Sequence, residues 1–598
     1  MKKKRQKTHV LSNNWYMLRQ VAKYSPGYLW MQLGEYLVGG LVEAVTSIYT
    51  KMLFDALDSR KSVTQTMWIV VMMIIFLIFV YIYYTSFRYY FQTFQRRALQ
   101  YRMQSDLIGR AVKLDVACYD DPVFYNDYVM AMEQANTRAE ELVKDVGSIL
   151  KYLISGISVI GVLLTVDIGI TVVVLIGNVA RVVFSLVINR LRIKEYEKLQ
   201  PETRKTEYVR RVHYLVDAAK ELRISRVGEN LKQEYDDAIE NLVDLRTKYG
   251  KYYSFLTAGS TLTGEILFGG VLVWLLYLLL VQKAILLGGF TVVINSMWRI
   301  SWYMRALMNS LVRMHEHALF IDKYLKFLAY EPQITGSQTQ IPSFERLQLQ
   351  DVDFAYAKDP VLQQVNLEIS RGEKIAIVGY NGAGKTTLIK LLMRLYDVSQ
   401  GQILWNGQNI RQFNPEEYRR RIGVVFQDYH IFAATVAENV LGADYRGPED
   451  DATVLKALEK ATFSDKLQTF QNGLNTLLTK EFDDNGENLS GGESQKVAIA
   501  RVFARPYDLI IMDEPSSALD PVAEYELNKS IAAYAEEQTV IFISHRLSTT
   551  RIADRIYMFS DGRIIESGSH EQLLAQNGEY AKMFRMQAEK YTQQTAVN

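Results

Sequence analysis

The sequence contains almost no cysteine and almost no net charge. Cys118 is the single cysteine among 598 residues, which excludes an intrachain disulfide and a cysteine-cluster zinc site. Lys and Arg total 68 against 66 Asp and Glu, so the formal net charge of +2 gives no basic field that would indicate nucleic acid as the main partner. The chain is 49% hydrophobic and 22% charged, which excludes a disordered or collagen-like protein, and its length allows roughly two to four domains.

The first half of the chain contains apolar runs that a soluble domain rarely tolerates. Residues Met67 to Tyr84 carry no charge and are long enough to cross a bilayer. The sequence predicts six spans of roughly 20 residues, which are 28–49, 67–84, 146–166, 168–188, 256–281 and 285–307. The first and the sixth of these spans are less apolar than the others, because each holds two charged residues.

The distribution of positive charge predicts the orientation of these spans. The chain starts with MKKKRQK, which no apolar core follows as it would in a cleavable signal peptide, and this charge predicts a cytoplasmic N-terminus. Segments 88–145 and 190–252 are rich in Arg and Lys, whereas the connection Val166-Asp167 is barely a turn. Positive charge therefore lies mostly on one side, and six crossings return the chain to the cytoplasm.

The two basic segments have helical patterns of their own. Residues Tyr89 to Leu114 contain no proline and carry apolar residues at helical spacing. We expect them to continue the second span for about 40 Å at 1.5 Å per residue. Segment 191–252 predicts a matching hairpin with a break near residues 226–228. Such segments are either ordinary solvated helix surfaces or rigid hairpins that transmit force.

The pattern of the chain changes after residue 330. The turn signal Glu331-Pro332 and the polar residues Thr335 to Gln340 end the membrane part. From Leu347 onward short β-rich runs alternate with helical ones, which predicts an α/β domain with a largely parallel sheet. We therefore expect a transmembrane domain at 1–330, a linker at 331–346 and an α/β domain at 347–598.

Residues 379–386 read GYNGAGKT and fit the phosphate-binding pattern G-x-x-x-x-G-K-[ST]. The run KIAIV precedes them and the helical run TTLIKLLMRL follows, as the motif requires. Glycines are needed because the backbone N–H groups wrap around phosphate oxygens, where a Cβ would obstruct. Lys385 supplies a full positive charge, and the Thr386 hydroxyl can bind Mg²⁺. The flanking strand and helix disfavour the alternative, a glycine-rich turn without a ligand.

Two further motifs accompany the phosphate loop. The apolar run LIIMDE ends in Asp513 and Glu514, which could put one carboxylate near a metal ion and the other near the γ-phosphate. The run LSGGE places Ser490, Gly491 and Gly492 at the start of a helical stretch, as a second possible anion-binding nest. One chain needs only one such cradle for one ATP.

With these motifs, residues Leu347 to Gln587 resemble the nucleotide-binding domain of the ABC transporters. Six spans followed by one such domain resemble a half-size ABC exporter. The resemblance implies a helical membrane bundle with long cytoplasmic extensions, an α/β P-loop ATPase domain of ABC type, and ATP and Mg²⁺ as cofactors. It also implies a second half-transporter as partner, most simply a homodimer. In that family the Ser-Gly-Gly nest of one subunit closes over the ATP on the phosphate loop of the other.

The resemblance assigns roles to residues by motif. Glu514 and His545 are the expected catalytic residues, and His545 holds the γ-phosphate. The expected nucleotide-binding residues, with Tyr356 stacking on adenine, are Tyr356, Gly379, Asn381, Gly382, Gly384, Lys385, Thr386, Thr387, Ser490, Gly491 and Gly492. The expected magnesium ligands are Thr386, Gln427 and Asp513. The chain departs from the common family form at Glu493, where Gln is usual, but this position lies beyond the Ser-Gly-Gly, so we expect activity to survive.

Three more segments take a role from the same resemblance. Residues Asp120 to Asp127 and Arg223 to Leu231 fall where the two coupling helices should dock on nucleotide-binding domains. Residues Ser517 to Asp520 resemble the loop that crosses to the partner subunit.

These observations predict an ATPase that drives export across the cytoplasmic membrane by alternating access in a dimer. We expect a multi-pass protein of a bacterial inner or plasma membrane, with both termini in the cytoplasm. Membrane lipid is an expected partner, and nucleic acid is not. The expected substrate is a peptide or an amphipathic, drug-like molecule. The alternatives are a lipid flippase, an importer with the exporter-type fold and, less favoured, an ATP-gated channel or regulator. Glu43 and Glu265 either recognise a cationic substrate or pair with other helices.

Overall fold

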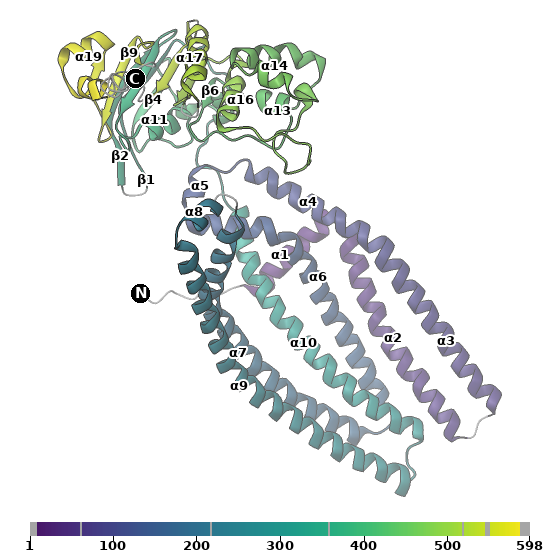
Figure 1. Cartoon of the computed structure of the whole chain (residues 1–598). Helices are drawn as coiled ribbons and strands as arrows, with labels where there is room; N and C mark the ends of the chain where they lie inside the picture. Colours follow the sequence, from purple (N-terminus) through teal and green to yellow (C-terminus); the bar gives the residue numbers. More distant parts are fainter. Residues whose placement is uncertain are drawn as a thin grey trace. The chain divides into compact units, whose positions relative to one another are not determined.

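The structure is a computed structural model of the whole chain, and it describes residues 9–59, 62–215, 218–356, 359–516, 519–536, 538–544 and 550–586. The chain forms two compact units. The first consists of Met1–Val112 and Pro122–Tyr330, and the second of Lys113–Asp121 and Glu331–Asn598. The described part of the first unit is helical, whereas the second combines helices with β-sheets (Figure 1).

The first unit is built from long helices joined by short connections. Two of the long helices continue into a π-helical segment. The elements are α1 (Val10–Tyr24), α2 (Pro26–Asp58), α3 (Val63–Ser86), η1 (Phe87–Gln92), α4 (Thr93–Ala111), α6 (Pro122–Leu164), α7 (Ile168–Tyr214), α8 (Ala219–Ile224), α9 (Val227–Leu276), η2 (Tyr277–Val281) and α10 (Leu287–Leu328).

Five helical stretches among the described residues are long and apolar enough to cross a membrane, and they match the first five predicted spans, of which the third ends two residues beyond its helix. They are Pro26–Leu57, Val63–Ala111, Pro122–Leu164, Ile168–Tyr196 and Val227–Val281. The sixth predicted span lies largely in α10, and packing against other helices explains why its sequence is more polar. This helix contacts α1, α2, α6 and α7 and buries residues such as Val293, Ile300 and Tyr303, so much of its surface faces other helices.

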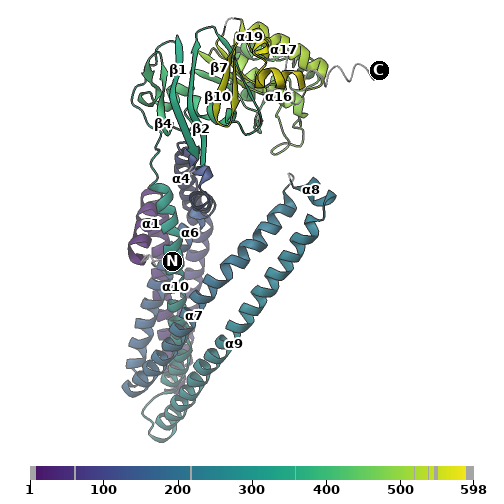
Figure 2. The same cartoon turned by 90° about the vertical axis from the view of Figure 1, so that its left-hand side faces the viewer.

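The predicted extensions of the spans are confirmed. The helix that begins at Val63 continues through the π-helical segment to Ala111. Helices α7 and α9 run side by side and are joined by the short helix α8 (Figure 2). The expected break near residues 226–228 lies where α8 ends and α9 begins.

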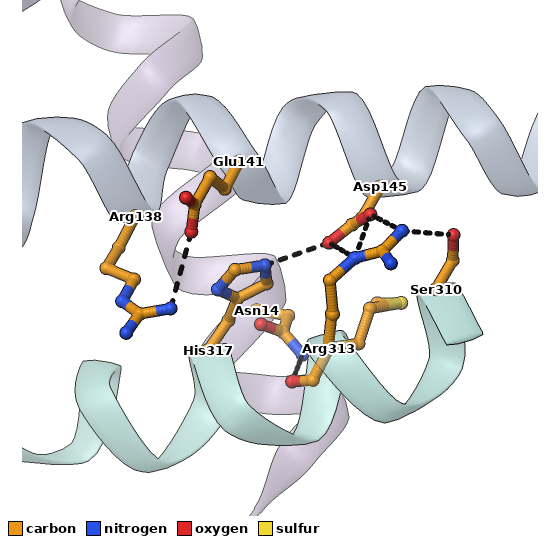
Figure 3. Close-up of polar contacts among 8 residues, drawn as sticks. Asn14, Arg138, Glu141, Asp145, Ser310, Arg313 and His317 are labelled. Atoms are coloured by element: carbon orange, nitrogen blue, oxygen red, sulfur yellow. Dashed lines mark hydrogen bonds and ion pairs between the residues drawn. The ribbon is translucent and has the colours of Figure 1, made fainter.

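A buried polar cluster ties α6 to α10 (Figure 3). The Asp145 carboxylate accepts a hydrogen bond from Arg313 Nε at 2.8 Å, and His317 Nε2 lies 3.0 Å from its other oxygen. Asp145 and His317 are 4% and 1% exposed. Asn14 of α1 donates to the Met314 carbonyl oxygen at 2.9 Å. Because a buried carboxylate is costly without partners, this cluster fixes the three helices against one another.

The described strands of the second unit form two sheets. The four-stranded antiparallel sheet has the order β2-β1-β4-β5, and the six-stranded sheet has the order β10-β9-β3-β8-β7-β6. The latter is parallel except for the β9–β10 pair, as the sequence predicts, whereas the antiparallel sheet was not predicted. The strands are β1 (Arg346–Tyr356), β2 (Asp359–Ser370), β3 (Lys374–Gly379), β4 (Gln400–Trp405), β5 (Gln408–Asn409), β6 (Ile422–Val425), β7 (Leu509–Asp513), β8 (Val540–Ile543), β9 (Arg555–Ser560) and β10 (Arg563–Gly568).

Two hydrophobic clusters hold most of the larger helices of the second unit, and α19 packs in a third. One cluster joins the antiparallel sheet to α11, and the other gathers α13, α14 and α16. The helices are α5 (Ala117–Asp120), α11 (Lys385–Leu392), η3 (Ile410–Gln412), α12 (Pro415–Arg419), α13 (Val436–Leu441), α14 (Pro448–Lys460), α15 (Ser464–Gln468), η4 (Gly473–Asn475), α16 (Gly491–Phe503), α17 (Pro521–Ala535) and α19 (His570–Gln576).

Candidate functional site

The phosphate loop connects β3 to α11, as the sequence predicts. Gly379 closes the strand where a Cβ would lie 2.3 Å from the Phe559 carbonyl oxygen, and Gly384 has φ +99° immediately before the helix. No side chain caps α11, so its first backbone N–H groups are left for a ligand. Lys385 Nζ donates to the carbonyl oxygens of Gly379 and Tyr380 at 2.7 and 2.9 Å. The loop is therefore a cradle that fits phosphate groups.

The other predicted residues of the loop surround this cradle. Asn381 and Gly382 are exposed, and Gly382 has φ +81° with open space where a Cβ would be. In the first turn of α11, Thr386 is exposed and Thr387 is 8% exposed. Thr386 is thus accessible to a ligand of the loop, whereas Thr387 is buried.

Two carboxylates lie at the end of β7, beside the end of β6, because Asp513 is the last residue of the strand and Glu514 follows it. Because these parallel strands are neighbours, Gln427, which follows β6, comes next to Glu514. Gln427 Nε2 donates to the Glu514 carboxylate at 3.3 Å, and Gln495 Nε2 donates to the Glu514 backbone carbonyl at 3.2 Å. Glu514 has φ +47°, an uncommon conformation for a residue other than glycine, and such backbone is frequent at functional sites.

The electrostatics of this group suit a metal ion. Burial and the neighbouring Glu514 charge raise the pKa of Asp513 to about 6, against the opposing effect of Lys385. Burial lowers the pKa of Lys385, although both carboxylates favour its charged form. Two carboxylates facing one lysine leave a net negative site, which a divalent cation would neutralise.

The predicted adenine-stacking residue ends β1. The Tyr356 ring meets the rings of Phe354 and Tyr396 edge to face, with centroids 4.9 and 5.4 Å apart. Lys390 Nζ lies 5.5 Å from the centroid of the same ring. Because Lys390 belongs to α11, the Tyr356 ring lies beside the helix that begins at the phosphate loop.

The second nest begins α16. The Ser490 side chain and Glu493 form a reciprocal capping box, in which the Ser490 backbone N–H donates to Glu493 at 2.8 Å. Lys466 Nζ lies 3.2 Å from the other Glu493 oxygen, and Tyr429 Oη donates to the Gly491 carbonyl oxygen at 2.6 Å. Burial alone would raise the pKa of Glu493, but the hydrogen bonds from Ser490 and Lys466 outweigh it and hold this pKa below its usual value.

The structure brings some predicted residues together and keeps others apart. Lys385, Gln427, Asp513 and Glu514 gather at the carboxyl ends of the parallel strands. The nest at Gly491 and Gly492 belongs instead to α16, which packs on α13 and α14 in the other hydrophobic cluster (Figure 1). His545, Ser517 and Ala518 lie outside the described residues. Asp520 caps α17 by accepting from two backbone N–H groups at 3.0 Å.

The two units divide one predicted coupling segment, because Asp120 and Asp121 belong to the second unit and residues 122–127 to the first. Tyr396 Oη donates to the Asp120 carboxylate at 2.6 Å, and the Gln333 backbone N–H donates to Asp115 at 2.7 Å. Val116 packs against the cluster that contains α11. The other segment, Arg223 to Leu231, covers the end of α8 and the start of α9. Docking by either segment stays a prediction.

The charged residues of the membrane spans have defined partners. Glu43 forms an ion pair with Lys151 at 3.1 Å, and Arg299 donates to Ser47 Oγ at 2.7 Å. This pairing favours a structural role for Glu43. Arg181 donates instead to the hydroxyl of Ser301.

Sequence reasoning missed three polar residues of the nucleotide-binding unit. Gln495 could have been found, because it follows the Ser-Gly-Gly directly on the same helix. Tyr396 and Lys466 carry no local signal, since their partners Asp120 and Glu493 come from distant segments.

Comparison with known proteins identifies the second unit. Residues 362–517 match the ABC transporter family. The subtilin transport ATP-binding protein SpaT of Bacillus subtilis is 26% identical over 489 residues, which cover 81% of this chain and 79% of that protein. The ATP-dependent lipid A-core flippase of Haemophilus ducreyi is 35% identical over 306 residues, so the match spans only 50% of this chain and 51% of the flippase.

A solved structure shows the same fold over nearly the whole chain. It is a bacterial Atm1-family ABC exporter with ATP bound, with a TM-score of 0.73, 22% identity and coverage of 93% of this chain and 98% of that one. Residues 362–517 thus belong to an ABC transporter domain, and the chain has the fold of a half-size ABC exporter, in which a multi-pass helical membrane domain is fused to one nucleotide-binding domain.

Proposed function

We propose that two copies of this chain form an ATP-driven exporter in which each ATP is held between the Lys385 loop of one copy and the Ser490 nest of the other. The observation that carries this proposal is that one domain has two cradles on different helices. The loop begins α11, whereas the nest begins α16, and the two helices belong to different hydrophobic clusters. Two cradles on one domain can be used together when two such domains meet face to face.

The residues of the loop fit ATP and Mg²⁺. Lys385 and the uncapped amides of α11 would hold the phosphates, and Tyr356 would stack on the adenine. The magnesium ion would be held by Thr386, Gln427 and Asp513, and it would neutralise phosphate charge during hydrolysis.

We propose that Glu514 acts as the base. Gln427 and Gln495 hold its side chain and its backbone, so the carboxylate is fixed beside Asp513 and can accept a proton from a water molecule. His545 is the proposed partner of the γ-phosphate. A Glu514→Gln variant should bind ATP without turning it over, and normal hydrolysis by that variant would refute the assignment.

ATP binding would close the nucleotide-binding domains and shift the membrane domains between inward- and outward-facing states. We propose a bacterial inner or plasma membrane with both termini in the cytoplasm, and a peptide or amphipathic molecule as substrate. Lipid flipping is the second candidate, because the similar proteins include a lipid A-core flippase as well as a subtilin transporter.

Subunit complementation tests the shared site. Lys385→Ala and Ser490→Arg variants should each be inactive as homodimers. When the two are co-expressed with different affinity tags and the mixed dimer is isolated, one site combines an intact loop with an intact nest, and about half of the wild-type number of sites is restored. If each chain hydrolysed ATP alone, the mixed dimer would stay inactive, and the proposal would fail.

Inside-out vesicles test the direction of transport. ATP-dependent accumulation of a labelled ligand inside them would indicate export, whereas equal leak without ATP would indicate a channel. The Glu514→Gln variant is the control, because it retains the membrane domain but cannot support repeated cycles.

A further inference from the structure

The segment that follows β6 lies against α16 and is fixed there by side chains. Arg501 of α16 donates from Nε to the Asn439 carbonyl oxygen at 2.9 Å and from Nη2 to the His430 carbonyl oxygen at 3.3 Å. The Asn439 side chain accepts from the Phe432 N–H at 2.9 Å and donates to the Phe432 carbonyl oxygen at 3.0 Å. Because Asn439 is only 1% exposed, these bonds give the segment around Tyr429 a defined position beside the helix.

Tyr429 of this segment contacts the nest directly. Its side chain is half-buried, and its hydroxyl donates to the Gly491 carbonyl oxygen at 2.6 Å. Burial raises the pKa of Tyr429, so the phenol keeps its proton and remains a donor at neutral pH. This bond comes from outside α16, whereas the capping box of Ser490 and Glu493 belongs to the start of the helix itself.

The carbonyl that Tyr429 holds belongs to the same peptide group as the Gly492 N–H. A trans peptide is planar, so the direction of the C=O bond fixes the direction of the N–H bond. At the start of a helix the backbone N–H groups point out of the helix and carry its positive dipole end. A hydrogen bond to the carbonyl also polarises the peptide, which makes its N–H a stronger donor. The Tyr429 hydroxyl therefore controls both the direction and the strength of the Gly492 donor.

The capping box leaves this donor available to a ligand. The Ser490 hydroxyl accepts from the Glu493 N–H at 3.3 Å, and the Glu493 carboxylate accepts from the Ser490 N–H at 2.8 Å. Among the described residues, no group accepts a hydrogen bond from the N–H of Gly491 or Gly492. These two amides are therefore the backbone donors that a phosphate group at the nest can use.

We propose that Tyr429 is a positioning residue of the shared ATP site, whose hydroxyl orients the Gly492 N–H toward a phosphate group of the partner's ATP. The inference rests on the proposed function, in which the nest of one copy closes over the ATP on the Lys385 loop of the other. The residue has no local signal in the sequence, because Tyr429 and Gly491 are 62 positions apart.

The mixed dimer of Lys385→Ala and Ser490→Arg chains tests this role, because it has a single complete site. The Lys385→Ala chain supplies the nest of that site, and the Ser490→Arg chain supplies its loop and its Glu514. Tyr429→Phe should lower kcat/KM for ATP about fivefold when it is placed in the Lys385→Ala chain, as expected for the loss of one neutral hydrogen bond. The same change in the Ser490→Arg chain should leave kcat/KM unchanged.

Each of the other results overturns the inference. Tyr429 lies two residues after Gln427, which contacts Glu514 at 3.3 Å, so a loss confined to the Ser490→Arg chain would mean that Tyr429 acts on the base. An equal loss in both chains would mean that Tyr429 supports the fold, and unchanged activity in both would mean that the nest does not need the bond. These three results leave the proposed function intact. A mixed dimer that is inactive without Tyr429→Phe would refute the proposed function, and this inference with it.

Tyr445→Phe is the matched control. The Tyr445 side chain is also half-buried in the second unit, and its hydroxyl donates to Asp451 in the first turn of α14. Tyr445→Phe removes one hydroxyl hydrogen bond away from the nest, so it should leave kcat/KM unchanged in either chain. An equal loss from this control would overturn the assignment to the nest. Thermal unfolding midpoints equal to that of the wild type establish that both variants are folded.

Discussion

The Lys466–Glu493 pair offers a sharp test of the nest at the start of α16. Glu493 lies three residues after Ser490, so its negative charge is close to the position proposed for the γ-phosphate of the partner's ATP. Lys466 Nζ is 3.2 Å from the Glu493 carboxylate, and the two side chains are 32% and 28% exposed. We expect Lys466 to neutralise Glu493 so that the nest can accept a phosphate group.

The structure sets the size of the effect. Two unit charges at this distance attract by about 5 kcal/mol at an effective dielectric constant near 20, but partial exposure leaves a net value of about 1 kcal/mol. Lys466→Met should therefore lower kcat/KM for ATP about fivefold. Glu493→Gln keeps an acceptor for the Ser490 N–H and removes the charge, so it should hydrolyse ATP at least as well as the wild type.

A double-mutant cycle of ATPase activity in proteoliposomes checks this reasoning. Once Glu493 is Gln, Lys466→Met should have no further effect. Lys456→Met, an exposed lysine on the neighbouring α14, is the control and should leave kcat/KM unchanged. An equal loss from Lys466→Met in both backgrounds would show that the lysine acts without the carboxylate, and the explanation would be wrong.

Three further predictions concern other polar groups. Because the pKa of Asp513 is about 6, protons compete with Mg²⁺ for this carboxylate at lower pH. Calorimetry with ADP present should therefore show that the affinity for Mg²⁺ falls about tenfold per pH unit below pH 6. An affinity that does not change with pH would contradict this. In the absence of metal, the Asp513 carboxyl binds its proton more tightly in the folded protein than in the unfolded chain, so its contribution to the free energy of unfolding decreases as the pH rises from about 4 to 6. In urea titrations, Asp145→Ala should lower the free energy of unfolding by about 3 kcal/mol. The half-buried Asp322, which pairs with Lys326 on the surface of the same helix, is the control, and Asp322→Ala should cost less than about 0.5 kcal/mol; equal losses would refute the cluster's role. Tyr396→Phe should speed amide exchange over residues 113–121 about tenfold, and unchanged exchange would show that the bond to Asp120 does not hold that segment.

The nucleotide-binding residues could be predicted because their chemistry is local in the sequence. Gly379 and Gly384 have positive φ values and belong to the same eight-residue motif as Lys385, so the motif and the local geometry coincide. Asp513 and Gln427 follow neighbouring parallel strands, and each is preceded by a recognisable apolar run. The antiparallel sheet was missed because its register depends on pairing between β1 and β4, which are separated by the whole phosphate loop.

The charge preference of the membrane domain could not be predicted in this way, since it depends on which charges cancel. In the sequence, Glu43 and Glu265 are two carboxylates within spans, and they favour a cationic ligand. In the structure, Lys151 of α6 pairs with Glu43, whereas Arg181 donates to Ser301 and interacts electrostatically with Glu265 and Arg305. Contacts among helices that are far apart in the chain therefore decide which charged residues of the spans are paired within the protein. Charged residues within the membrane spans indicate the charge of a substrate only after those that pair with one another inside the protein have been set aside.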